Sequence, residues 1–146
     1  MLGPHVEQLT VSGNPDDLGE SLSTLRNFVG MAGEQAGLET QAIHRLRLAV
    51  DEIAANIIMY GYADAPGVVE ATAAIDDLRL TITLEDTAPP YDPLERDLPD
   101  NLGDPLDTRE IGGLGVFLAL RNVDEFHYER VGERNRNVFV MNRRSS

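Results

Sequence analysis

The order of helical and strand patterns is the feature that most limits how this chain can fold. Two early stretches, 18–36 and 40–61, carry apolar residues at helical spacing. Alternating apolar and polar residues predict strands at 6–11, 67–75, 78–85, 124–131 and 137–142. One more helix is expected at 113–122. Early helices and late strands favour an α+β fold over a doubly wound one: a two-layer sandwich of a mixed, mostly antiparallel sheet with helices on one face.

Local signals set the expected helix boundaries. Asn14 followed by Pro15 predicts an N-cap and a first helical residue, and Gly37 suits the end of that helix. Thr40 begins the second helix, which ends near Gly61. The apolar stripe of this second helix consists of Ile43, Leu46, Val50, Ile53 and Ile57.

Composition excludes several classes of function. The 146 residues fit a single domain, 1–146, and the chain has no cysteine for disulfides or thiolate chemistry. A net charge of −13 argues against nucleic acid and anionic membranes as partners. All 12 basic residues are arginine, so lysine chemistry is excluded and bound phosphates would need backbone amides, a metal ion or arginine. No signal peptide or stretch of about 18 apolar residues is present, so a cytoplasmic location is expected.

An acid and an amide share one face of the second helix. Glu52 and Asn56, in LAVDEIAANIIMYGY, are four residues apart and flank the apolar stripe. They form either an ordinary polar helix edge or a site in which the Asn56 oxygen binds Mg²⁺ and Glu52 accepts a proton. Asp51 is expected to form a surface ion pair with Arg47, one turn earlier.

An aspartate ends the strand at 78–85. Asp86, in LEDTAPPYDP, either caps a proline-rich turn or accepts a hydrogen bond from the exocyclic amine of an adenine. The small side chain of Ala88 would let a flat base approach the backbone.

A glycine-rich stretch, IGGLGVFLAL, follows a long irregular segment. The segment 88–111 lacks periodicity and is rich in proline, as in lids over binding sites. The glycines at the start of the predicted helix indicate either a flexible loop or a place where the backbone approaches a phosphate.

The order and separation of these motifs resemble the Bergerat-type (GHKL) ATPase fold. Within it, the chain is similar to the compact bacterial anti-sigma factor serine kinases of the sporulation and general-stress partner-switching systems. DEIAANIIMYGY resembles their N-box, EDTAPPYDP their adenine box and GGLGVFLA their phosphate box. The resemblance covers about 6–142 and includes the closing hairpin.

The resemblance implies a role for each matching residue. Glu52 matches the catalytic base, Asn56 the Mg²⁺ ligand and Asp86 the carboxylate that binds the adenine amine, with Ala88 beside the base. The residues whose backbone would surround the phosphates are Gly112, Gly113, Leu114 and Gly115. Arg109 is a candidate for contact with the γ-phosphate, or else an exposed residue of the lid. Ala88 and Tyr60 depart from the glycine and histidine that relatives often carry.

The resemblance also implies an activity and partners. The expected function is a protein serine/threonine kinase that uses ATP and Mg²⁺ to phosphorylate a STAS-type anti-sigma factor antagonist. A sigma factor as a second partner, and a homodimer, are implied in the same way. Two alternatives remain: a partner-switching module that binds ATP without efficient transfer, and an α+β domain that binds no nucleotide.

Overall fold

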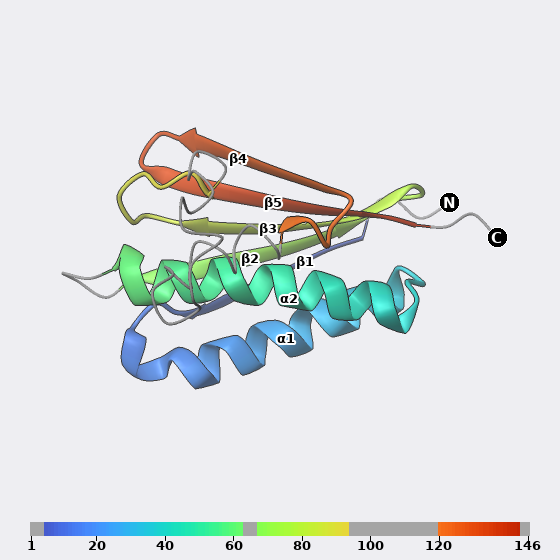
Figure 1. Ribbon diagram of the computed structural model, residues 1–146, viewed down its shortest axis with the longest axis horizontal. Helices are drawn as coiled ribbons and strands as arrows, with labels where there is room; N and C mark the ends of the chain where they lie inside the picture. Colours follow the sequence, from blue (N-terminus) through green and yellow to red (C-terminus); the bar gives the residue numbers. More distant parts are fainter. Residues whose placement is uncertain (1–4, 63–66, 94–119, 144–146) are drawn as a thin grey trace, which may run out of the picture.

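The computed structural model describes residues 5–62, 67–93 and 120–143. Within these ranges, five strands form one sheet in the order β1-β2-β3-β5-β4, and two long helices lie side by side on one of its faces (Figure 1). The strands are β1 (His5–Ser12), β2 (Val68–Ile75), β3 (Arg79–Asp86), β4 (Glu125–Val131) and β5 (Arg134–Asn142). The helices are η1 (Pro15–Asp17), α1 (Leu18–Gln35), α2 (Thr40–Asn56) and η2 (Ile57–Gly61). The expected α+β class and two-layer arrangement are confirmed.

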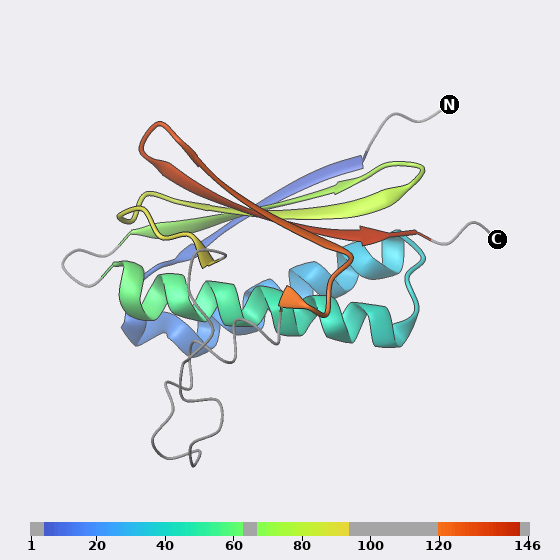
Figure 2. The same cartoon turned by 45° about the horizontal axis from the view of Figure 1, so that its top comes forward.

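The sheet was expected to be mixed and mostly antiparallel, and its described strands are antiparallel throughout. Each pairing between described strands is antiparallel: β1 with β2, β2 with β3, β3 with β5 and β5 with β4. All five predicted strands are present, and β5 begins earlier than expected, at Arg134. The two outer strands, β1 and β4, are far apart in the sequence, and no described helix covers the second face of the sheet (Figure 2).

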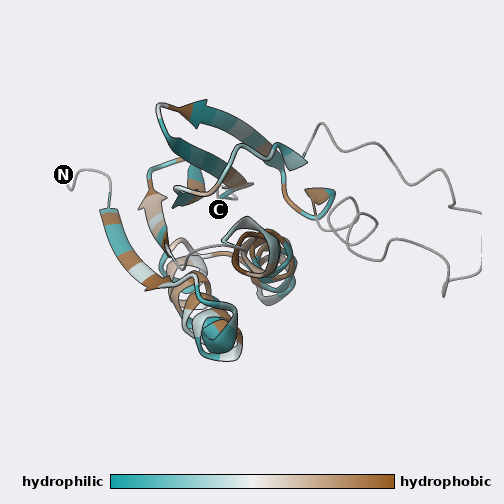
Figure 3. Cartoon of the chain, turned by 90° about the vertical axis from the view of Figure 1, so that its left-hand side faces the viewer, coloured by the Kyte–Doolittle hydropathy of each residue, from teal (hydrophilic) through white to brown (hydrophobic). Residues whose placement is uncertain are grey.

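The apolar core lies between the helices and the inner face of the sheet. Figure 3, which looks along α1 and α2, shows both helices on the same side of the strands. Alternate residues of β2 and β3 are buried, as expected for a sheet with one covered face. The predicted stripe of α2, from Ile43 to Ile57, is buried in full. The largest fully buried side chains include Leu25, Leu46, Ile53, Ile82, Leu84 and Phe139.

The predicted end of α1 is confirmed, whereas its start differs: Pro15 begins a 3₁₀ turn, η1, and α1 itself begins at Leu18. The Asn14 side chain accepts a hydrogen bond from the backbone N of Asp16 at 3.0 Å, capping the single 3₁₀ turn that leads into α1. Gly37 follows the helix with a φ of +76°, a conformation that glycine adopts without steric cost.

The second helix does not continue as a single α-helix to Gly61, as the sequence suggested. It ends at Asn56, and a π-helical turn, η2, covers Ile57–Gly61. Both Ile57 and Ile58 are buried in η2, although adjacent residues of an α-helix point in different directions. The wider turn therefore accommodates two consecutive isoleucines in the core, directly after Asn56. Such π turns are frequent at functional sites.

The expected ion pair between Arg47 and Asp51 is wrong. Asp51 Oδ2 pairs instead with Arg26 Nε of α1 at 2.7 Å, and Arg47 Nε donates to the Arg26 carbonyl oxygen at 3.1 Å. Because α1 and α2 pack side by side, a partner on the neighbouring helix competes with one on the same helix. Both residues thus join the two helices.

Glycines of α1 let α2 approach closely, which gives a testable effect on stability. A Cβ added at Gly33 would lie 2.6 Å from Ile43 Cγ1, whereas one at Gly19 would meet nothing within 4 Å. We expect Gly33→Ala to lower the free energy of unfolding by about 1–3 kcal/mol, the usual result of overpacking. Gly19→Ala is the matched control and should raise it by up to about 1 kcal/mol. Urea denaturation measures both, and equal effects of the two substitutions would contradict this packing.

Candidate functional site

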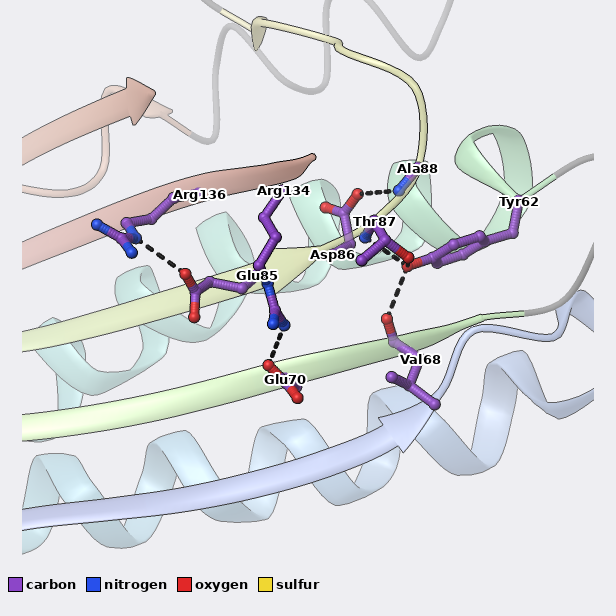
Figure 4. A network of polar contacts seen from close by, with 9 residues as sticks. All are labelled: Tyr62, Val68, Glu70, Glu85, Asp86, Thr87, Ala88, Arg134 and Arg136. Carbon is purple, nitrogen blue, oxygen red and sulfur yellow. Dashed lines mark hydrogen bonds and ion pairs between the residues drawn. The ribbon is translucent and has the colours of Figure 1, made fainter. Parts of the chain in front are cut away.

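A buried carboxylate ends β3 with only one of its oxygens in use. Asp86 is 2% exposed, and its Oδ1 accepts a hydrogen bond from the backbone N of Ala88 at 3.0 Å (Figure 4). The same oxygen accepts a second hydrogen bond from Asn135 Nδ2 at 2.9 Å. Its Oδ2 is buried and has no hydrogen-bond partner among the described residues. A buried polar atom without a partner is costly, so this oxygen is suited to accept from a ligand.

The surroundings of Asp86 act on its pKa in opposite directions. Burial has the largest effect and raises the pKa of the carboxyl above its ordinary value. The hydrogen bonds from Asn135 and Ala88, and the positive charges of Arg130 and Arg134, lower the same pKa. The net effect is a raised pKa, which means that the fold makes the ionised form of this carboxyl less favourable than it is in water.

The C-terminal hairpin supplies two buried carboxamides that the sequence reasoning missed. Asn135 and Asn137 are 3% and 2% exposed, on the inner face of β5, and Asn135 pairs in register with Asp86. Asn137 Oδ1 has no hydrogen-bond partner among the described residues. Strand alternation places both asparagines on the same face as Phe139 and Met141, and two polar residues on a core face were the signal that could have revealed them.

The basic residues of β5 point the other way, onto the open face of the sheet. Arg134 pairs with Glu70 there, and Arg136 pairs with Glu85 at 3.0 Å (Figure 4). Arg136 also pairs with Glu129 at 2.8 Å. These arginines are therefore engaged with glutamates across β2, β3 and β4. Asp86, on the inner face, has no ion pair with them.

On the helical layer, Glu52 and Asn56 are both half-buried at the edge of the apolar stripe of α2, as predicted. Asn56 Nδ2 is buried without a hydrogen-bond partner in the described part of the chain. Asn56 Nδ2 is thus a second buried polar atom without a partner at this end of the described fold.

The end of the helical layer touches the segment that follows β3. A Cβ added at Gly61 would lie 3.0 Å from the Cβ of Ala88, which is 4% exposed. The structure therefore places Glu52 and Asn56, on α2, at the same end of the molecule as Asp86 and Ala88. Ala88 packs against Gly61, where a larger side chain would push the two segments apart.

A tyrosine also fixes the backbone next to Asp86. The Tyr62 hydroxyl donates to the carbonyl oxygen of Val68 at 2.9 Å and accepts from the backbone N of Thr87 at 2.8 Å (Figure 4). Gly67 makes room for the tyrosine ring, because a Cβ there would lie 2.3 Å from its Cε1. Tyr62 thus joins the end of η2 to β2 and to the exit of β3, a role that the sequence analysis did not assign.

Comparison with known proteins identifies the family of this fold. The model of the histidine kinase-like ATPase domain matches residues 15–142. The chain belongs to the histidine kinase-like ATPase domain family. Its fold is also similar to that of the histidine kinase domain from Erythrobacter litoralis EL346 blue-light activated histidine kinase, with a TM-score of 0.53 and 17% sequence identity. The match covers 86% of this chain and 61% of that one, so this chain spans less than two thirds of that domain. No curated protein matches the sequence.

The described residues of this histidine kinase-like ATPase domain fit Mg-ATP. The unpartnered Asp86 oxygen can accept from the adenine amine, and the Asn56 carboxamide, whose buried Nδ2 has no partner among the described residues, can turn an oxygen toward a cation. No group of three or more His, Asp or Glu side chains that could hold a metal is found in residues 5–62, 67–93 and 120–143. A Mg²⁺ ion beside Asn56 would take oxygens from phosphates and water, as this ion commonly does.

Part of the predicted site lies outside the described residues. Arg109 and the glycine-rich residues Gly112, Gly113, Leu114 and Gly115 all fall in 94–119. Their roles stay predictions. In the part of this ATPase domain that the structure does describe, no helix is both long and apolar enough to cross a membrane.

Proposed function

We propose that this ATPase domain is an ATP-dependent protein serine/threonine kinase. The observation that carries the proposal is the buried, unpartnered Oδ2 of Asp86 at the end of β3. An ionised oxygen in this position favours a ligand that offers a hydrogen-bond donor, and adenine offers one in its exocyclic amine. The family match supports ATP as the source of that adenine.

The residues of α2 supply the reacting end of the proposed site. The Asn56 oxygen would hold Mg²⁺, which neutralises phosphate charge when bound. Glu52, one turn earlier, would orient the serine or threonine hydroxyl and take its proton. The hydroxyl oxygen forms a bond to the γ-phosphorus as the bond to the β,γ-bridging oxygen breaks and ADP leaves.

The phosphates are assigned to residues beyond the described ranges. By family resemblance, the backbone amides of Gly112, Gly113, Leu114 and Gly115 surround them, and Arg109 reaches the γ-phosphate. Since the chain has no lysine, these groups and Mg²⁺ carry the charge stabilisation in this proposal.

The partners are proposed from the same resemblance. The phosphate acceptor is a STAS-type anti-sigma factor antagonist, a sigma factor binds a second surface, and the chain forms a homodimer in the cytoplasm. The net charge of −13 supports protein partners over nucleic acid.

Binding and transfer are tested separately with the unmodified chain. We expect Mg-ATP at about 100 times its dissociation constant to add roughly 2.7 kcal/mol to the free energy of unfolding. With radiolabelled ATP and STAS proteins of the same organism, label should reach a partner in an acid-stable linkage, as in phosphoserine. EDTA should abolish the transfer.

Other outcomes decide between the alternatives. ATP-dependent stabilisation without transfer to any partner would support a switching module that binds ATP as a conformational ligand. An acid-labile linkage would indicate phosphohistidine and contradict serine/threonine specificity. No stabilisation at millimolar ATP would overturn the proposed function altogether.

A further inference from the structure

Asn135 lies at the centre of a hydrogen-bond network around Asp86. Its Nδ2 faces three acceptors: Asp86 Oδ1 at 2.9 Å and the carbonyl oxygens of Ala88 and Pro89, both at 3.1 Å. We propose that Asn135 is a positioning residue that sets base selectivity by holding Asp86 with one oxygen occupied and the other turned to the ligand. This inference rests on the proposed function, because it concerns the base of the same nucleotide.

The network determines the orientation of the Asn135 carboxamide. Its Oδ1 is approached by three donors: the Tyr128 hydroxyl, Arg130 Nη1 at 3.3 Å and the backbone N of Tyr91 at 3.4 Å. A flipped amide would place its NH₂ group against these donors and its oxygen against Asp86 and two carbonyl oxygens. The carboxamide is therefore fixed with its donor toward Asp86.

The same contacts tie together segments that are distant in the sequence. Arg130 of β4 also donates to the Ala88 carbonyl oxygen at 2.8 Å, so both strands of the hairpin hold the segment after β3. Asn135 is 3% exposed, which protects these bonds from competition with water. Asp86 cannot turn its carboxylate without losing the bonds from Asn135 and Ala88.

The charge state of Asp86 connects this geometry to base selection. An ionised carboxylate only accepts hydrogen bonds, so Oδ2 suits the 6-amino group of adenine and opposes the 6-oxo group of hypoxanthine or guanine. A protonated carboxyl could donate to that oxo group instead. Burial favours protonation by raising the pKa, while Asn135, Ala88, Arg130 and Arg134 lower the pKa of Asp86. Asn135 is the side chain among these that donates directly to the carboxylate.

The test compares ATP with ITP, which carries an oxo group in place of the 6-amino group. Calorimetry gives both dissociation constants for the unmodified chain, Asn135→Ala and Asn135→Asp at pH 6, 7 and 8. We expect Asn135→Ala to reduce the preference for ATP over ITP roughly tenfold, which is the size expected for one hydrogen bond to a charged group. Asn135→Asp keeps the shape but replaces the donor with an acid, and should reduce the preference at least as much.

A second measurement does not depend on a nucleotide. The NMR titration of the Asp86 carboxyl carbon in the ligand-free chain should show a higher midpoint in both Asn135 variants than in the unmodified chain. In these variants the preference for ATP should fall with decreasing pH, starting at a higher pH than in the unmodified chain. A residue that only stabilises the hairpin would leave both readouts unchanged.

The control is Val140→Ala, a buried substitution on the same strand that does not touch Asp86. It should lower stability but leave the ATP to ITP preference and the Asp86 midpoint in place. The inference is overturned if the Asn135 variants keep both values, or if Val140→Ala shifts them equally. Either result leaves the proposed function standing when the unmodified chain still binds and uses ATP. Failure of the unmodified chain to bind ATP would overturn the proposed function and this inference together.

Discussion

Replacing Glu52 with glutamine is expected to slow phosphoryl transfer about a hundredfold or more, the range attributed to a positioned general base. Glutamine keeps the size of the side chain and its half-buried place on α2 but cannot take up the proton of the attacking hydroxyl. ATP binding should change little, because binding of the adenine and of the phosphates is assigned to other residues. Single-turnover rates with a labelled partner, together with calorimetric ATP affinities, separate the two effects.

The neighbouring acid provides the control for this experiment. Asp51 is also half-buried on α2, but it pairs with Arg26 of α1 at 2.7 Å and is not assigned to the site. Asp51→Asn should therefore leave the transfer rate nearly unchanged and cost at most about 1 kcal/mol in stability, as for a surface ion pair. Transfer that survives Glu52→Gln, or that is lost equally in Asp51→Asn, would contradict the assignment of Glu52.

Replacing Asp86 with asparagine should have opposite effects on binding and on stability. The asparagine keeps an oxygen that accepts from Ala88 and Asn135. In place of the free Oδ2, however, it has an NH₂ group, so two hydrogen-bond donors, this group and the adenine amine, would face each other. We expect ATP binding to weaken about a hundredfold, the upper end for a hydrogen bond to a charged group. Calorimetry with Mg-ATP measures this loss.

The stability effect follows from the raised pKa of Asp86, whose ordinary value is 3.8. For a raised pKa, the stabilising contribution is complete below the ordinary value and is lost as pH rises through the raised one. Asparagine has no charge to lose, and a neutral buried group costs less than an ionised one. The melting temperature of the ligand-free Asp86→Asn variant should therefore exceed that of the unmodified chain at pH 8, and the difference should shrink toward pH 4.

An exposed aspartate gives the opposite sign and serves as the comparison. Hydrogen bonds from the backbone N of Leu78 and of Arg79 lower the pKa of Asp76, in the turn between β2 and β3. Its contribution is present above the ordinary pKa and is lost as pH falls through the lowered one. Asp76→Asn should thus lower the melting temperature at pH 8. Equal signs for the two variants would show that the burial of Asp86 does not govern its effect.

Local patterns were sufficient to predict most of the fold. The apolar stripe of α2 and the alternation in β2 and β3 directly indicate which face of each element is buried. Asn14 and Gly37 could be interpreted because their effects involve only neighbouring residues. The π-turn after Asn56 escaped prediction, because it depends on how Ile58 packs in the finished core. The pairing of Asp51 with Arg26 was missed for a similar reason: it requires the position of a second helix.

The candidate site divides in the same way. Glu52, Asn56 and Asp86 were singled out by their spacing and position in the sequence, and their proposed roles came from the resemblance of the surrounding motifs to the GHKL ATPases. Asn135 was missed because its role depends on the pairing of β5 with β3, which joins residues 49 positions apart. Tyr62 was missed because its partners, Val68 and Thr87, come from two other elements.

The direction of the strands has a practical consequence for building on this domain. His5 pairs with Ile75, and Asn142 pairs with Arg79. The start of β1 and the end of β5 therefore both lie beside the β2–β3 turn. Asp86 lies at the opposite end of β3, whose eight residues span roughly 25 Å. A reporter or tether joined at the start of β1 or at the end of β5 would therefore be attached at the end of the sheet opposite Asp86, which suits a fusion that must leave the proposed adenine site accessible.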